Sequence, residues 1–358
     1  MDYLSRQEKL AQALLDGQLD GFVVAHPPNL RYLCGYTGSN GLLVFLGGAC
    51  TFFTDGRYTQ QAREEVQGAH IVIARGVLFD ALGKLLGRVR SAAIGFEADN
   101  TSVAAAAEMR RSAHKGISWK AISGLIMRQR IVKDADELRA LRRAVKLGAE
   151  AFQRAVQSMR PGLRECEIAA NLELVARQAG ADGMSFETIV AGGERSALPH
   201  GRATRQPLPR RGFVVLDSGV ILRGYCSDMT RTLHMGRASR EGHKWYKAVL
   251  EAQLSAIAAV KAGKTAGEVD QAARNSLARA GLARHFTHST GHGVGLEIHE
   301  PPRIGRGQEQ PLQPGMVITI EPGIYVPGRG GIRIEDMVIV TATGCEVLTP
   351  VAKQLIEV

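Results

Sequence analysis

The chain has 358 residues, which is longer than one typical domain and predicts two. Its formal net charge of +10 comes from basic residues spread along the sequence, which favours a solvated basic surface and excludes a nucleic-acid partner from our expectations. No apolar run reaches membrane-spanning length and no signal-peptide pattern opens the chain, so we expect no membrane partner. The five scattered cysteines contain no CxxC pair and indicate reduced thiols in a cytoplasmic protein.

The first 130 residues alternate strand-like and helical patterns, which predicts a small α/β domain. A capping-box pattern at Ser5 and Glu8 opens a helix that we expect to bury Leu15. The dipeptide Pro27-Pro28 marks a loop. The expected strands are 21–25, 41–46, 50–54, 70–74 and 92–96, and the expected helices are 60–66, 78–89 and 103–110. No glycine-rich phosphate-binding motif occurs, so nucleotide binding has no support.

Residues Asp55 to Tyr58 form a turn followed by a helix. An exposed arginine is the simpler interpretation of Arg57, and a ligand contact is the alternative. A long helix opens at Asp134, with apolar residues at helical spacing and charged residues on the opposite face. The domain boundary precedes this helix, so the expected domains are 1–130 and 131–358.

The second domain is predicted to be an internal duplication. Two helix starts, at 160–168 and 261–269, share a basic residue, glycine and glutamate at an offset of 101, and both helices end at an Ala-Gly pair. A strand hairpin follows each copy, and each hairpin carries two carboxylates at strand ends: Asp217 and Asp228, then Glu321 and Glu335. Agreement along the whole unit predicts an α+β domain with a pseudo-two-fold axis where the hairpins meet.

Four carboxylates in a small volume repel one another and raise their pKa values. Two divalent cations relieve this repulsion, which is the arrangement of a two-metal hydrolytic site. His292 lies between the hairpins in sequence and can add one nitrogen ligand, a set that suits Mn²⁺, Co²⁺ or Zn²⁺. The alternative is that the acids form salt bridges with Arg231 and Arg333, which we expect for one acid but not for all.

At these residues the chain resembles the Xaa-Pro peptidases of the pita-bread metallopeptidase family, which comprise aminopeptidase P and prolidase. The motifs are Leu198-Pro-His200-Gly201, Asp217-Ser-Gly219, Ser227–Thr232, His288–Gly295, Ile298-His299-Glu300, Glu321-Pro-Gly323 and Arg333–Asp336. The resemblance implies a creatinase-type N-terminal domain over 1–130 and a pita-bread domain over 131–358. It also implies two divalent metal ions, Mn²⁺ first with Co²⁺ or Zn²⁺ as alternatives, held by Asp217, Asp228, His292, Glu321 and Glu335.

The resemblance places three histidines in the substrate site. We expect Glu321 to shuttle a proton as base and then acid. His288 and His299 are expected to donate to the developing oxyanion or to the leaving nitrogen, and His200 to lie beside the proline ring. Thus the predicted catalytic residues are His200, His288, His299 and Glu321. The predicted substrate contacts are His200, His299, Arg333 and Arg57, with binding of a carboxylate ligand as the alternative role of Arg333.

The leading hypothesis is a metal-dependent Xaa-Pro aminopeptidase, a dinuclear metallo-exopeptidase that removes an N-terminal residue followed by proline. Segments 32–40 and 54–58 resemble the N-terminal domains of short bacterial aminopeptidases P. The alternatives are an Xaa-Pro dipeptidase (prolidase) and a non-catalytic pita-bread binding scaffold, against which the intact ligand set argues. The expected partners are proline-containing peptides and a second copy of the chain in a homodimer, with the N-terminal domain as the available lid.

Overall fold

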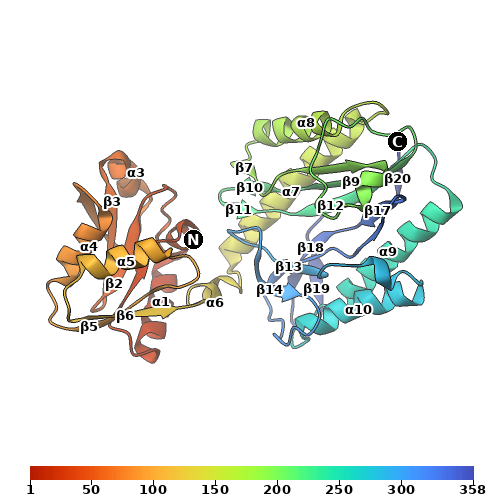
Figure 1. Ribbon diagram of the computed structural model, residues 1–358. Coiled ribbons are helices and arrows are strands. Elements are labelled where there is room, and N and C mark those ends of the chain that lie inside the picture. The colour runs from red at the N-terminus through yellow and green to blue at the C-terminus, as the bar shows by residue number, and fades with distance from the viewer. The chain divides into compact units, whose positions relative to one another are not determined.

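The computed structural model describes all of residues 1–358. They form two compact units, Met1–Arg130 and Ile131–Val358, coloured red to yellow and yellow to blue in Figure 1. None of the helices combines the length and the apolar character that crossing a membrane requires.

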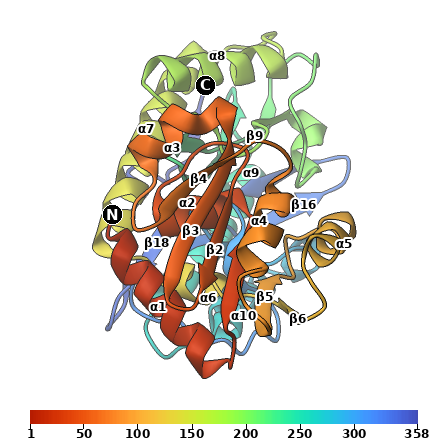
Figure 2. The same cartoon turned by 90° about the vertical axis from the view of Figure 1, so that its left-hand side faces the viewer.

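The first unit is built on a six-stranded mixed sheet with the strand order β4-β3-β2-β1-β5-β6. The strands are β1 (Gly21–Val24), β2 (Leu42–Leu46), β3 (Ala49–Asp55), β4 (His70–Ala74), β5 (Ala92–Glu97) and β6 (Ile117–Ile122). The helices are α1 (Tyr3–Asp16), α2 (Pro27–Cys34), α3 (Thr59–Glu65), α4 (Leu78–Leu86), α5 (Val103–Ser112) and α6 (Met127–Arg130). Figure 2 shows α4 on one side of the strands and α1 on the other.

Local details of this unit differ from the sequence-based expectations. The N-cap of α1 is Asp2, whose carboxylate accepts from the Ser5 backbone N–H, so Ser5 lies inside the helix. Leu15 is 70% exposed because it falls outside the buried stripe of α1. Pro27 opens α2 instead of a loop, since the first helical turn does not need the N–H that proline lacks. Strand β6 was not expected from the sequence.

The second unit contains two helix pairs and two main sheets. The helices are α7 (Ala135–Ser158), α8 (Glu165–Gln178), α9 (Arg240–Ala259) and α10 (Ala266–Arg279). One sheet has the order β20-β12-β9-β8, with bounds Ile356–Glu357, Met229–Met235, Gly212–Ser218 and Ile189–Gly192. The other has the order β14-β13-β15-β18-β19, with bounds Glu300–Ile304, Gly291–Gly293, Val317–Ile320, Asp336–Val340 and Cys345–Val347.

Short strands complete the second unit. A three-stranded sheet joins β11 (Tyr225–Cys226), β10 (Val220–Leu222) and β7 (Gly183–Met184), and a hairpin joins β16 (Gly323–Val326) to β17 (Gly330–Arg333). In Figure 1 the strands lie between the pair α7 and α8 and the pair α9 and α10. One hydrophobic core packs α7 and α8 on β9 and β12, and another packs α9 and α10 on β15 and β18.

The duplication predicted from the sequence is visible in these elements. The two copies run α7, α8, β9–β12 and α9, α10, β15–β18. Helices α8 and α10 begin one residue after Arg164 and Thr265, whose backbone N–H groups donate to Glu167 and Glu268, and their C-caps are Ala179 and Ala280, again 101 residues apart. The repeated capping and packing signals therefore encode two similar half-domains that place two hairpins against each other.

Helix α8 offers a direct test of which residues hold the second unit together. Leu172 is fully buried in the core between α8 and the first sheet, whereas Leu174 on the same helix is 55% exposed. We predict that Leu172→Ala lowers the free energy of unfolding of this unit by about 2–5 kcal/mol, because it leaves a cavity. Leu174→Ala is the matched control and should change it by less than about 0.5 kcal/mol. Urea unfolding followed by fluorescence checks both, and equal effects would contradict this core assignment.

Candidate active site

The two hairpins bring four carboxylates to one place. In the first, Asp217 lies near the end of β9 opposite Thr230, and Asp228 directly precedes β12. In the second, Ile320 pairs with Asp336, so Glu321 and Glu335 flank the last rung of the ladder. The acids thus occupy the same end of each hairpin. Thr230 joins the hairpins, because its hydroxyl donates to the Glu335 carboxylate at 2.7 Å and its carbonyl accepts from the Glu335 N–H at 3.1 Å.

Burial and mutual repulsion control the ionisation of this cluster. Burial, followed by the charges of Asp228, Glu321 and Asp217, raises the pKa of Glu335 well above its ordinary value. Burial raises the pKa of Glu321 to about 7, although His292 and Arg333 oppose the shift. Burial also raises the pKa of Asp217 to about 6, against the opposing charge of Arg333. The protein alone therefore does not fully compensate the negative charge that these residues would carry.

The unpaired atoms of the cluster fit a bound cation. Asp217 Oδ1 and Glu335 Oε1 are buried oxygens without a hydrogen-bond partner. Asp228, His292 and Glu335 each offer one ligand atom, and these three atoms lie within 4.8 Å of one another. Buried acceptors without donors are costly unless a positive charge satisfies them. The donor set of carboxylate oxygens with one imidazole is therefore compatible with hard or borderline divalent metals.

His292 is oriented as metal-binding histidines are. Its Nδ1–H donates to the Gly293 carbonyl at 2.9 Å, which leaves Nε2 as the second nitrogen. Nε2 lies 3.5 Å from both Asp228 Oδ2 and Glu321 Oε1. Burial lowers the pKa of His292, but the hydrogen bond with Asp228 and the charges of Glu321 and Asp228 outweigh it and raise the pKa to about 9. The neighbouring carboxylates thus favour positive charge at the position of the His292 ring.

Arg333 connects the carboxylate cluster to the rest of the site. Its guanidinium donates to Asp217 Oδ2 at 2.6 Å, to the Thr230 hydroxyl at 3.0 Å, to the Pro199 carbonyl at 3.0 Å and to the Tyr325 hydroxyl at 2.8 Å. An arginine has five N–H donors, so four contacts leave little capacity for a further ligand. The salt bridge expected for one acid is present at Asp217, where Arg333 holds one oxygen and leaves the other free.

The hydrogen bonds of His288 fix its tautomer. Its Nδ1–H donates to the Ser289 carbonyl at 2.7 Å, and its Nε2 lies 2.9 Å from the Tyr325 hydroxyl. Since Arg333 donates to the Tyr325 oxygen, the Tyr325 hydroxyl proton is free to donate to Nε2. Burial and the charge of Arg333 lower the pKa of His288 to about 4. His288 is thus a neutral ring whose two nitrogens are both engaged.

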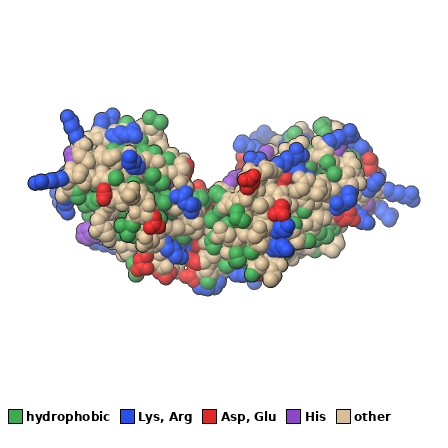
Figure 3. Space-filling model, turned by 90° about the horizontal axis from the view of Figure 1, so that it is seen from below, with side chains coloured by type: hydrophobic (Ala, Val, Ile, Leu, Met, Phe, Trp, Pro, Cys, Tyr) green, Lys and Arg blue, Asp and Glu red, His purple; other side chains and the backbone are tan.

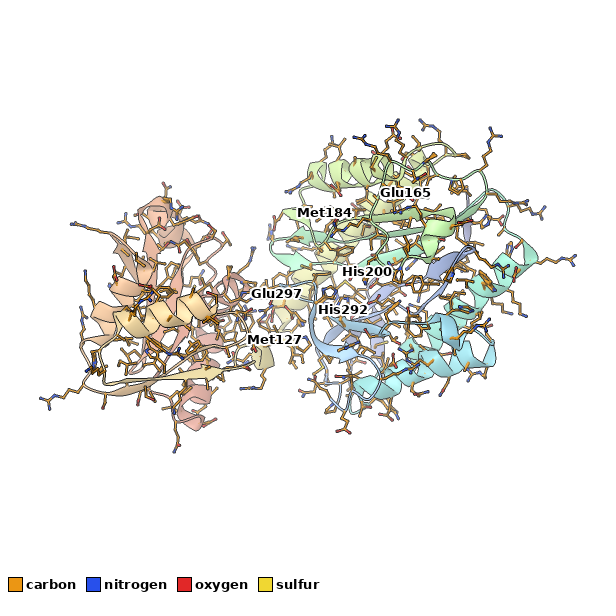
Figure 4. The ribbon with its side chains drawn as sticks, in the orientation of Figure 1. Met127, Glu165, Met184, His200, His292 and Glu297 are labelled. Atoms are coloured by element: carbon orange, nitrogen blue, oxygen red, sulfur yellow. The ribbon has the colours of Figure 1, made fainter.

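His200 and His299 are available to a substrate. Both are exposed, and neither ring nitrogen of either residue has a hydrogen-bond partner in the protein. The His299 ring packs edge-on against His292 with centroids 4.4 Å apart. Burial lowers the pKa of His299, and the charges of His292 and His200 lower it further. Figure 4 shows His200 and His292 at neighbouring positions among the strands of the second unit.

Two further arginines from the sequence analysis have different surroundings. Arg231 is 1% exposed and pairs with Asp336 at 2.7 Å, while it also donates to the carbonyls of Val351 and Ala352, so it anchors the C-terminal segment. Arg57 lies in the first unit, is 72% exposed and pairs with Asp55 at 2.9 Å. It borders a cavity of about 640 Å³ in that unit, whose walls include Leu30, Leu42, Leu78 and Phe79.

The sequence analysis missed residues that support the site. Tyr325 follows the predicted ligand Glu321 by four positions, and its burial with a polar hydroxyl was the available signal. Glu300, the residue after His299, forms a buried ion pair with Lys133 at 3.1 Å. On the face of the molecule drawn in Figure 3, Lys and Arg side chains are spread over both units, with Asp and Glu side chains among them. Side-chain partners of this kind depend on tertiary packing.

Both units match known protein families. Residues 139–342 match metallopeptidase family M24, and residues 6–132 match the creatinase/prolidase N-terminal domain. An Xaa-Pro dipeptidase of Pyrococcus horikoshii is 35% identical, with 99% of this chain and 100% of the relative covered.

Solved structures extend this similarity to the whole fold. An Xaa-Pro dipeptidase from Bacillus anthracis is 37% identical with a TM-score of 0.96, and the match covers 100% of both chains. An X-Pro aminopeptidase from Thermotoga maritima is 35% identical with a TM-score of 0.91, covering 95% of this chain and 98% of the other. These matches confirm the expected fold class, a creatinase-type domain followed by a pita-bread domain.

The geometry predicts which substitutions remove bound metal. Asp228→Asn and Glu335→Gln each remove a charge from the cluster and should reduce the divalent metal content of purified protein, with an activity loss of more than about a hundredfold. Glu321→Gln should show a similar loss of rate because it also removes the proposed proton carrier.

His200→Ala is the control, because His200 lies outside the ligand cluster. It should retain its metal content and turn substrate over poorly. Metal analysis of each variant by plasma mass spectrometry checks this assignment. Loss of metal from His200→Ala, or full metal content in Glu335→Gln, would contradict it.

Proposed function

The chain belongs to metallopeptidase family M24, and we propose that it hydrolyses the bond between an N-terminal residue and a following proline. The observation that carries this proposal is the cluster of Asp217, Asp228, His292, Glu321 and Glu335, in which two buried carboxylate oxygens have no partner. Two of its relatives of known structure are named Xaa-Pro dipeptidase and X-Pro aminopeptidase. We propose that the five residues hold two divalent metal ions.

We propose Mn²⁺ as the metal, with Co²⁺ or Zn²⁺ as alternatives. Carboxylates outnumber imidazole four to one among the proposed ligands, and such oxygen-rich sets suit Mn²⁺. The nearby thiol of Cys226 does not compete, because burial raises its pKa to about 12. When bound, the ions supply Lewis acidity and lower the pKa of a water molecule. All five cysteines are unpaired, which supports the proposal of a cytoplasmic protein.

The residues of the chain divide the remaining work. Glu321 belongs to the cluster, and a carboxylate beside the attacking water can take its proton and return it to the leaving nitrogen. That nitrogen belongs to proline, which carries no hydrogen in the peptide bond, so it must gain one as the bond breaks. His299 and His200 have free ring nitrogens for contact with the peptide. We propose that His200 lies beside the pyrrolidine ring and that His299 stabilises the oxyanion.

His288 and Arg333 act behind these groups in our proposal. Both nitrogens of His288 are engaged, so we propose that it holds Tyr325, whose hydroxyl in turn contacts Arg333. The expected donation from His288 to the oxyanion or to the leaving nitrogen stays a prediction. Arg333 binds Asp217 Oδ2, which orients the free Oδ1. This assigns Arg333 the role of binding a carboxylate ligand. The expected substrate contact by Arg333 stays a prediction.

Peptide length separates the two activities considered from the sequence. Relatives named Xaa-Pro dipeptidase and X-Pro aminopeptidase match this chain at 35–37% identity over nearly its full length. Of these three relatives, the two that the match covers completely are named dipeptidases, and we therefore propose Xaa-Pro dipeptides as substrates. Cleavage of longer Xaa-Pro-Yaa peptides was the leading expectation from the sequence and stays a prediction. A hydrolysis assay that compares Xaa-Pro with Xaa-Pro-Yaa peptides tests it. The expectation of a homodimer is tested by light scattering.

Metal removal tests the proposed function. We predict that the purified protein hydrolyses Xaa-Pro, that exhaustive chelation abolishes this activity, and that Mn²⁺ or Co²⁺ restores it, since the carboxylate cluster needs cations. A matched peptide with alanine in place of proline is the control substrate and should be cleaved poorly. Full activity after confirmed metal loss would refute the metal-dependent mechanism, and equal cleavage of the alanine peptide would refute the specificity for proline.

Arg57 tests whether the first unit contributes to selectivity. We propose that its exposed guanidinium, beside the 640 Å³ cavity, contacts a peptide carboxylate. Arg57→Ala should change the ratio of kcat/KM for a tripeptide to that for a dipeptide by more than about threefold, without abolishing either activity. The exposed Arg63 on α3 provides the control substitution, Arg63→Ala. An unchanged ratio in Arg57→Ala would leave Arg57 as an exposed turn residue paired with Asp55.

A further inference from the structure

Outside the proposed metal cluster, the carboxylate of Glu165 is buried and fully satisfied by hydrogen bonds. Glu165 is the first residue of α8 and its side chain is 1% exposed. It accepts from the Gly192 N–H at 2.9 Å, from Arg195 Nε at 3.1 Å, and from the Thr204 N–H and hydroxyl at 3.0 and 2.6 Å. Burying a carboxylate is costly unless donors of this kind surround it. The arrangement therefore fixes the positions of all its donors.

These donors flank His200 on both sides in sequence. Gly192 and Arg195 precede it, and Thr204 follows it. Arg195 Nη2 also donates to the Arg202 carbonyl at 2.7 Å, which closes the segment across its base. The segment 192–204, which we call the His200 loop, is thus held at both ends by one carboxylate. Figure 4 labels Glu165 at the start of α8 and His200 on this loop.

The far side of the His200 loop is attached to the catalytic cluster. The Pro199 carbonyl, adjacent to His200, accepts from Arg333, which also binds Asp217. The Ser196 hydroxyl accepts from the Gly331 N–H at 2.8 Å. The His200 ring itself has no hydrogen-bond partner in the protein, so its place in the site depends on the loop backbone that carries it.

We infer that Glu165 is a positioning residue for the proposed peptidase reaction. It contacts neither the metal ligands nor the open face of His200, and it acts by holding the loop that places the His200 imidazole against the substrate. The inference rests on the proposed function, in which His200 contacts the proline ring. A displacement of about 1 Å at a substrate-contacting group costs on the order of a hundredfold in rate, so a clamp on this loop has a measurable effect.

Glu165→Gln tests the inference with little change in volume. The amide loses the charge and presents an NH₂ group toward donors that need an acceptor. We expect kcat for an Xaa-Pro substrate to fall about 10- to 100-fold with metal content unchanged. Glu167→Gln is the matched control, because Glu167 caps the same helix end through the Arg164 N–H but does not contact the His200 loop. It should lower kcat by less than about threefold.

A double-mutant cycle separates positioning from a general structural effect. In the His200→Ala background, Glu165→Gln should lower kcat by less than about threefold further, because the residue through which it acts is gone. The same factor in both backgrounds, or loss of metal from Glu165→Gln, would overturn the inference. Arg195→Gln provides a second variant should Glu165→Gln fold poorly, since Arg195 is 29% exposed, and its effect should likewise vanish in His200→Ala.

Hydrogen–deuterium exchange gives a readout that does not depend on activity. Exchange of the His200 loop should accelerate at least about tenfold in Glu165→Gln and stay unchanged in Glu167→Gln. Unchanged exchange in Glu165→Gln would overturn the inference. If the wild-type protein does not cleave Xaa-Pro, the proposed function fails. If it does and Glu165→Gln is fully active, only the inference about Glu165 fails.

Discussion

Electrostatic repulsion among four buried carboxylates is the constraint on which the second unit depends. Folding brings Asp217, Asp228, Glu321 and Glu335 together because two hairpins meet at their ends. Burial raises the pKa values of three of them, which means that folding opposes their ionisation. Arg333 and His292 are the basic side chains that contact these carboxylates. The fold therefore leaves negative charge at the carboxylates only partly compensated by the protein. This uncompensated charge favours the binding of cations at the cluster.

Arg333 links the carboxylate cluster to the surrounding segments of the site through its hydrogen bonds. Its single planar guanidinium reaches the first hairpin at Asp217, the second at Tyr325, and the His200 loop at Pro199. A lysine has no comparable geometry, since its ammonium cannot hold three directions in one plane. A movement of the Asp217 carboxylate is thus coupled to the loop that carries His200. The position of Asp217 and the position of the His200 loop are thus both fixed by contacts with the Arg333 side chain.

The duplicated helices and carboxylates of the second unit could be predicted from the sequence, whereas side-chain contacts formed by tertiary packing could not. The duplication was readable because helix caps and carboxylates recur at nearly constant offsets, and the observed half-domains follow them. The orientation of His288 was not readable, since its tautomer depends on Tyr325 and Ser289 contacts that only packing creates. Pro27 was misread as a loop because proline at a helix start and proline in a turn look alike in sequence.

Each half of the second unit uses a buried carboxylate on its second helix to hold a histidine-bearing segment. In the first half Glu165 on α8 holds the His200 loop. In the second half Asp270 on α10 accepts from Arg274 and Thr290, and Arg274 donates to the His288 carbonyl at 2.6 Å. The two carboxylates are not at equivalent positions of the repeat, so each half holds its histidine-bearing segment with a different residue. A tertiary requirement, that loops around a charged cluster be rigid, therefore persists where the sequences of the two copies have diverged.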